Sequence, residues 1–138
     1  MKMVFKAKRP GGGVRSAGGD IYLSGISGGK NSRHALCVRF SEDVLHRLRW
    51  RIGDRVYMEL DRDGSTDTWT FNRVPEDDVE GLKISANGRD DGPGTVRRTC
   101  GEDEMKSVFP NCRRGYQGFL VEGDSKRAVF VVDLADSE

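Results

Sequence analysis

Apolar residues alternate with polar ones along several short segments of this 138-residue chain, and turn-forming residues separate those segments. Residues 55–60, for example, place Val56, Met58 and Leu60 on one face of an extended chain. An alternation of period two indicates a strand with one buried face, whereas a helix would scatter the same residues around its axis. The pattern therefore restricts most of the chain to a sheet-based fold.

Eight segments have this strand-like character: 21–27, 34–40, 55–60, 69–74, 82–85, 95–99, 115–123 and 127–134. The connections 28–33 and 61–68 are short and rich in turn-forming residues, so they predict hairpins between the strands that flank them. The last two segments predict a closing hairpin. We therefore expect an α+β or mostly β domain, with an antiparallel sheet or small barrel of about seven to eight strands.

One segment breaks the strand pattern and predicts a helix. Ser41 offers a hydroxyl at a helix N-cap, and the residues after it place apolar side chains at helical spacing: Val44, Leu45 and Leu48. We predict one clear short helix over about residues 41–50, ended by Gly53, which can adopt the left-handed conformation that a helix terminus favours. Residues 102–109 predict a helical turn or a little more.

The length is that of one domain. Residues 1–19 are basic and glycine-rich, so we expect a flexible arm there, followed by a single globular domain over 20–138. Within it, 20–74 form a hairpin–helix–hairpin unit and 75–138 a second set of strands, with no internal repeat visible in the sequence. No apolar run approaches the roughly 20 residues of a membrane span. Three cysteines and no long apolar stretch at the N-terminus indicate free thiols in the cytoplasm.

The charges are distributed unevenly. Residues 1–60 carry a net charge of +7 and the remaining 78 a net charge of −6, although the whole chain is close to neutral at +1. The two halves either neutralise each other across the folded surface or leave a basic face for an anionic partner. Cations at the end of the predicted helix complement its dipole, but that effect accounts for two of them at most. The candidate phosphate contacts are Lys30, Arg33, Arg39, Arg47, Arg49, Arg51 and Arg55.

Residues 38–71 resemble the swapped-hairpin AbrB/MazE-type transcription-factor domain. The shared order is a strand, a short helix with a leucine face, a corner at Gly53-Asp54 followed by Val56, an alternating strand, an acidic glycine-containing turn and a further strand. This chain has Ser41 and Glu42 where the family usually places proline. The resemblance implies a dimer that exchanges hairpins and lays a basic face of strands and loops on DNA.

Other motifs fit structural roles better. Residues 114–121 are similar to an RNA-recognition strand, but alternation places Tyr116 and Phe119 on opposite faces, whereas base stacking needs both on one face. Trp50 is interpreted as a core residue that docks the helix end, with base stacking as the alternative. Four residues could ligate zinc without forming a Cys-x-x-Cys pair: His34, Cys37, Cys100 and Cys112. We predict no metal or cofactor.

These observations predict a small nucleic-acid-binding protein with an accessory or regulatory role, with double-stranded DNA favoured over RNA and a homodimer as one arrangement. The alternative is a protein-interaction module, such as a phage-type or regulatory protein that binds a partner through strand edges or its acidic C-terminal half. An enzyme is not expected. Only His34 and His46 could serve as bases near neutral pH, and no nucleophile stands at a recognisable spacing from either.

Overall fold

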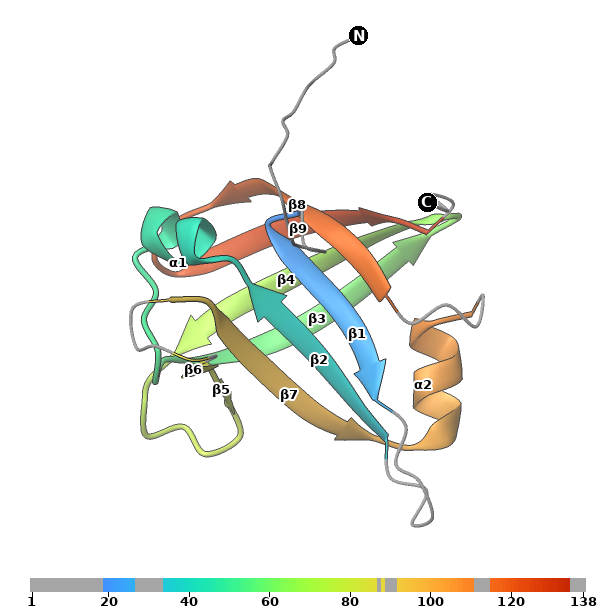
Figure 1. Ribbon diagram of the computed structural model, residues 1–138, viewed down its shortest axis with the longest axis horizontal. Coiled ribbons are helices and arrows are strands. Elements are labelled where there is room, and N and C mark those ends of the chain that lie inside the picture. Colours follow the sequence, from blue (N-terminus) through green and yellow to red (C-terminus); the bar gives the residue numbers. More distant parts are fainter. Residues whose placement is uncertain (1–18, 27–33, 87, 89–91, 111–114, 135–138) are drawn as a thin grey trace, which may run out of the picture.

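The computed structural model describes residues 19–26, 34–86, 88, 92–110 and 115–134 (Figure 1). Residues 1–18 of the predicted arm, Lys30, Arg33 and Cys112 lie outside these residues. The elements are β1 (Ile21–Ile26), β2 (His34–Phe40), α1 (Glu42–Leu48), β3 (Arg55–Asp63), β4 (Thr66–Val74), β5 (Leu82–Lys83), β6 (Ser85–Ala86), β7 (Gly94–Cys100), α2 (Glu102–Val108), β8 (Gly115–Gly123) and β9 (Arg127–Asp133).

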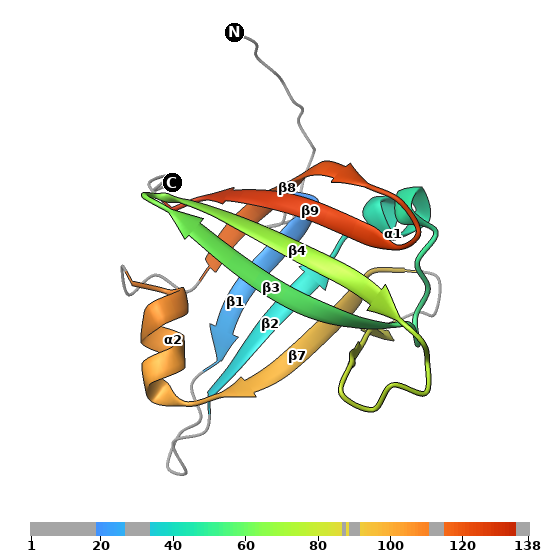
Figure 2. The same cartoon turned by 180° about the vertical axis from the view of Figure 1, so that it is seen from behind.

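The nine strands form one antiparallel sheet that curls into a nearly closed barrel (Figures 1 and 2). Its order is β5-β3-β4-β9-β8-β1-β2-β7-β6. The two ends of this order are joined through Ile84, because β5 pairs with β3 and β6 pairs with β7 on either side of that residue. Ile84 is fully buried, and its amide and carbonyl bond the backbone of Asp54 and Gly53 at 2.8 Å each. The mostly β antiparallel fold is thus confirmed. The single strand predicted at 82–85 is divided in two, which raises the strand number to nine.

The barrel interior holds the apolar residues that the alternation selected. Phe40, Phe71 and Phe130 meet edge to face near its centre, with ring centroids 5.0 to 5.9 Å apart. Each is fully buried, and each contributes roughly 2 to 3 kcal/mol of hydrophobic stabilisation. Tyr116 is also buried while Phe119 is 55% exposed, so the prediction that these two aromatic residues occupy opposite faces is confirmed.

The two halves of the chain repeat the same order of elements. β7, α2 and β8 each begin and end 60 residues after β2, α1 and β3. The β8–β9 turn is one residue longer than the β3–β4 turn, so β9 begins 61 residues after β4. Equivalent residues face each other where the halves meet: Cys37 is paired with Arg97, and Trp69 with Phe130. Such self-pairing is what a two-fold axis produces, so the barrel has a pseudo-two-fold symmetry that the sequence did not reveal.

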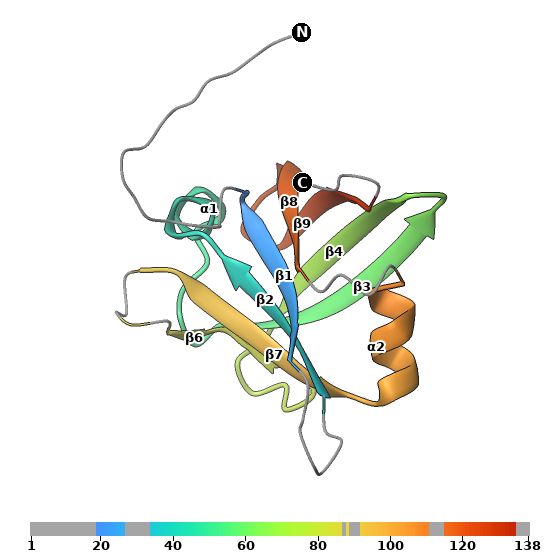
Figure 3. The ribbon, with the colours of Figure 1, turned by 45° about the vertical axis from the view of Figure 1, so that its right-hand side comes forward.

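Two short helices lie at opposite ends of the barrel (Figures 1 and 3). α1 has the predicted N-cap, where the Ser41 hydroxyl accepts a hydrogen bond from the Val44 amide at 3.1 Å. The helix ends at Leu48 rather than at Gly53, and Arg49 instead of a glycine adopts the left-handed conformation there. Gly53 has a φ of 102° and forms the corner before β3. α2 is longer than the turn predicted for it. In the part of the chain that the structure covers, neither helix has the length and apolar character needed to cross a bilayer.

Candidate nucleic-acid interface at the end of α1

The chain leaves α1 through a left-handed residue. Arg49 has φ 62° and ψ 34°, its amide donates to the His46 carbonyl at 3.1 Å, and the Trp50 amide donates to the Leu45 carbonyl at 2.9 Å. These two bonds satisfy carbonyls that the helix end would otherwise leave unpaired. Among the described residues other than glycine, Arg49 alone has a positive φ. A side chain in this conformation costs about 1 to 2 kcal/mol relative to glycine.

Trp50 explains why the chain turns so sharply. Its ring is 3% exposed and packs edge-on against Phe40, with centroids 6.1 Å apart. The indole N–H donates to the Ser125 carbonyl at 3.0 Å, which fastens the helix end to the β8–β9 turn. The interpretation of Trp50 as a docking core residue is therefore confirmed. Because Trp50 points inward, Arg49 and Arg51 on either side of it point out to solvent.

Three cationic or titratable side chains surround one surface depression at this exit. His46, Arg49 and Arg51 line it together with Leu45 and Trp50, and its volume is about 300 Å³. The three side chains are exposed, and none forms an ion pair with any residue that the structure describes. The Asp54 carboxylate nearby accepts a hydrogen bond from the Arg51 amide at 2.9 Å. It therefore contacts the backbone of Arg51 and not the Arg51 guanidinium.

Two further cations reach the same region, one from β4 and one from the β8–β9 turn. The Trp50 bond to Ser125 brings Lys126 to the helix exit, and the Lys126 carbonyl accepts from the Arg73 amide at 2.8 Å. Arg73 is exposed and lies 3.6 Å from Asp54. These five residues are called the basic corner below: His46, Arg49, Arg51, Arg73 and Lys126. Sequence reasoning missed Arg73 and Lys126 as members because only contacts between distant segments bring them here.

The other predicted arginines lie apart from the basic corner or are engaged. Arg47 lies 3.7 Å from Asp43 and 4.0 Å from Asp20, in half-exposed pairs of little energetic weight. Arg55 is half-buried and donates to the Gly81 carbonyl at 2.8 Å. The patch predicted from the sequence is therefore divided, and of the helix-exit arginines only Arg49 and Arg51 share the depression.

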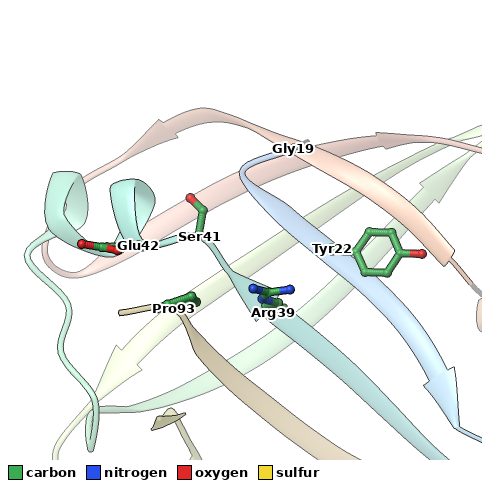
Figure 4. A pocket seen from close by; sticks show the side chains of 6 residues that line it. All are labelled: Gly19, Tyr22, Arg39, Ser41, Glu42 and Pro93. Carbon is green, nitrogen blue, oxygen red and sulfur yellow. The ribbon is translucent and has the colours of Figure 1, made fainter. Parts of the chain in front are cut away.

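Arg39 lies at the other end of α1. It projects from the outer face of β2 into a separate pocket of about 190 Å³, beside Tyr22, Glu42 and Pro93 (Figure 4). Arg39 is exposed and has no ion-pair partner among the described residues. This pocket therefore holds one arginine, and it lies at the opposite end of α1 from the basic corner.

The candidate zinc ligands do not converge. His34 and Cys100 are cross-strand partners in β2 and β7. Cys37 lies three positions after His34 along β2, an odd number, so its side chain points to the other face of the sheet. Burial raises the pKa of the Cys37 thiol above its ordinary value, which disfavours the thiolate that a metal requires. No group of three or more histidine, cysteine or carboxylate side chains arranged for a metal occurs within the described ranges. Comparison with known proteins adds no assignment, since no family model, curated protein or solved structure matches this chain.

Proposed function

We propose that this protein binds nucleic acid, with double-stranded DNA as the favoured form, by holding backbone phosphates at the basic corner. The observation that carries the proposal is the depression beside Trp50, where three side chains capable of binding anions stand together without carboxylate partners in the described structure. Guanidinium groups bind phosphate oxygens through paired, charge-assisted hydrogen bonds. Since cations on a surface repel one another, such a grouping favours an anionic ligand.

The conformation of Arg49 is a second argument. Glycine would occupy a left-handed helix terminus without strain, and an exposed arginine adds no packing that could offset its cost. Strain at an exposed position is a feature of binding sites, because function rather than stability then selects the residue. In this proposal Arg49 is retained for its contact with phosphate.

The geometry favours contacts with the backbone over readout of bases. The cations lie on a helix end and a strand turn of a compact barrel, and α1 has only seven residues. Contacts of this kind fix position and supply affinity, but they carry no direct sequence information. We therefore expect binding that depends strongly on salt and weakly on sequence.

The proposed relationship to the swapped-hairpin family has support in the order of elements. Residues 38–71 run from β2 through α1 and the Gly53-Asp54 corner into β3 and β4, as the resemblance implies. In that family a two-fold arrangement arises from two chains. Here the two halves of one chain provide it, so we expect a monomer, with a mass near 15.4 kDa by light scattering, rather than the exchanged dimer.

The test measures the affinity of the full chain for a fluorescent 20-base-pair DNA duplex at several salt concentrations. The variants are Arg49→Gly and Arg51→Ala. Each removes one phosphate contact, so each should weaken binding roughly fivefold, for a contact of about 1 kcal/mol, and reduce the salt slope by about one. Arg49→Gly should at the same time raise the thermal stability, because it relieves the left-handed strain.

The matched control is Lys106→Ala. Lys106 occupies the position in α2 that His46 occupies in α1, and its one ion pair with the described residues is an exposed contact with Glu102 at 3.5 Å. Its removal should leave DNA affinity unchanged. The proposal is wrong if wild-type protein fails to bind the duplex at low salt, or if all three variants weaken binding equally.

A further inference from the structure

The way the barrel closes leaves most of the outer edge of β7 without a partner strand in the described part of the chain. On one side β7 pairs with β2 along its whole length, from Gly94 to Cys100. On the other side it pairs with β6 at Gly94 and Thr95 only. From Val96 to Cys100, that side has no strand partner among the described residues. An unpaired strand edge presents backbone amides and carbonyls that can bond an added strand.

The pseudo-two-fold symmetry shows which strand covers the equivalent edge in the first half of the barrel. The equivalent edge of β2 is covered by β1, which pairs with it at six consecutive residues and bonds β8 on its other side. In the second half, β5 and β6 have two residues each and stand in the position of β1. The second half therefore has a strand of similar length, but that strand divides its pairing between β3 and β7 and leaves most of the β7 edge without a partner among the described residues.

The exposure of β7 agrees with an open edge. Arg97, Arg98 and Thr99 are consecutive, and all three are exposed although they point alternately to the two faces of the sheet. A strand with neighbours on both sides and one buried face would show alternating burial. The flanking residues Val96 and Cys100 are buried, so the open stretch is confined to three positions.

The chemistry of these positions selects the partner. Arg97 has no ion pair with the described residues, and Arg98 keeps a half-exposed contact with Glu104 at 3.3 Å. Two neighbouring arginines on opposite faces of the strand match two neighbouring carboxylates on an added strand. A second copy of β7 would instead bring four arginines together, and like charges on paired strands are destabilising. The charged residues thus disfavour the pairing of two β7 edges and leave the edge available to an acidic strand.

We propose that the edge of β7 from Val96 to Cys100 binds an extended segment of a partner protein that carries two adjacent acidic residues. The segment adds a strand to the sheet through backbone hydrogen bonds, and its carboxylates contact Arg97 and Arg98. This site is separate from the basic corner, and neither proposal depends on the other.

The test uses the full chain and a fluorescent peptide, acetyl-Thr-Val-Thr-Glu-Glu-Val-Thr-Val-amide, in an anisotropy titration. The comparison peptides replace both glutamates with lysine, or carry N-methyl groups on alternate amides. The acidic peptide should bind saturably, and the methylated one should not, because its backbone cannot bond the edge. Hydrogen exchange of the amides between Val96 and Cys100 should slow when the acidic peptide is bound.

Charge reversal supplies the variant. Arg97→Glu with Arg98→Glu should weaken binding of the acidic peptide at least tenfold and should create binding of the lysine peptide. The control reverses two exposed cations elsewhere, Lys106→Glu with Arg127→Glu, which changes the net charge equally and should leave both results unchanged. The proposal is overturned if the acidic peptide does not bind, if the methylated peptide binds as well, or if both double variants weaken binding alike.

Discussion

The ion pair between Arg62 and Asp67 joins the tip of the β3–β4 hairpin to α2. Asp67 is 1% exposed and accepts two hydrogen bonds from the guanidinium, at 2.7 Å from Nε and 2.9 Å from Nη2. The same guanidinium donates to the Ser107 and Val108 carbonyls at the end of α2. The hydrogen bond to Asp67 is the main cause that raises the pKa of Arg62. One arginine thus satisfies a buried carboxylate and two helix-terminal carbonyls.

Replacing Arg62 with methionine leaves the buried carboxylate without a cation. Breaking a buried pair costs about 3 to 5 kcal/mol. The Arg62 side chain is 30% exposed, so solvent screens part of the interaction and we expect about 3 kcal/mol. Asp67→Leu should cost a similar amount, since it leaves a partly buried guanidinium unpaired. The double variant should be more stable than the sum of the two losses predicts, by roughly 2 kcal/mol, because no unpaired charge remains.

Equilibrium unfolding in urea measures these differences. With a denaturant dependence of about 2 kcal/mol per molar, Arg62→Met should move the midpoint down by about 1.5 M. The control is Arg127→Met, which removes a half-exposed contact of 3.8 Å to Glu122 and should shift the midpoint by less than about 0.5 M. Equal shifts for Arg62→Met and Arg127→Met, or strictly additive losses in the double variant, would contradict the reasoning.

Two further outcomes follow from single contacts. Ser41→Ala should lower the free energy of unfolding by about 1 kcal/mol, since the Val44 amide loses its capping acceptor, whereas Ser41→Thr should restore most of it; thermal unfolding measures both. Hydrogen bonds from the Lys126 and Arg127 amides lower the pKa of the Asp124 carboxyl. The ionised Asp124 therefore stabilises the fold above the unfolded pKa near 4, and this stabilisation is lost as the pH falls through the lowered pKa of the folded state. Asp124→Asn should therefore reduce the dependence of stability on pH below about 4, and an unchanged acid-unfolding profile would contradict this expectation.

Local patterns in the sequence predicted most of the elements. The strand-like segments placed every strand except the divided pair β5 and β6, which had been predicted as one strand, and Ser41 and the leucine face of α1 placed the helix start. These features act over a few residues, so their physical causes are contained in the segment itself. The helix end was different. Gly53 was the residue expected there, but the burial of Trp50 turns the chain four residues earlier. The indole of Trp50 bonds the Ser125 carbonyl, and that contact joins distant parts of the chain.

The two-fold repeat was hidden because equivalent positions share burial rather than identity. Leu45 in α1 corresponds to Met105 in α2, and Val56 in β3 corresponds to Tyr116 in β8; all four are buried. A hydrophobic core accepts many combinations of apolar side chains of suitable total volume, so a repeated backbone does not require a repeated sequence.

The candidate site was only partly predictable for a related reason. Arg49 and Arg51 could be named because they flank a helix end, which is a local feature. Their neighbours Arg73 and Lys126 come from β4 and the β8–β9 turn, and the pairing of distant strands brings them to the helix. Arg47 does not line the depression, and its guanidinium lies near Asp43 and Asp20 instead. Charge alone indicates a partner class, whereas the sheet topology decides which charges meet.

The repeat also shows that the barrel itself does not require the cation at the end of α1. The residue equivalent to Arg49 at the end of α2 is Phe109, which has a φ of −119° and so no left-handed strain. Phe109 is buried and stacks on Tyr116 with centroids 5.9 Å apart, so this helix end contributes to the core. Both helices therefore end at an apolar anchor, Phe109 after α2 and Trp50 after α1, but only α1 reaches its anchor through an exposed left-handed arginine. The burial of Trp50 explains the left-handed turn itself, and the proposed phosphate contact is our explanation for an arginine rather than a glycine at that turn.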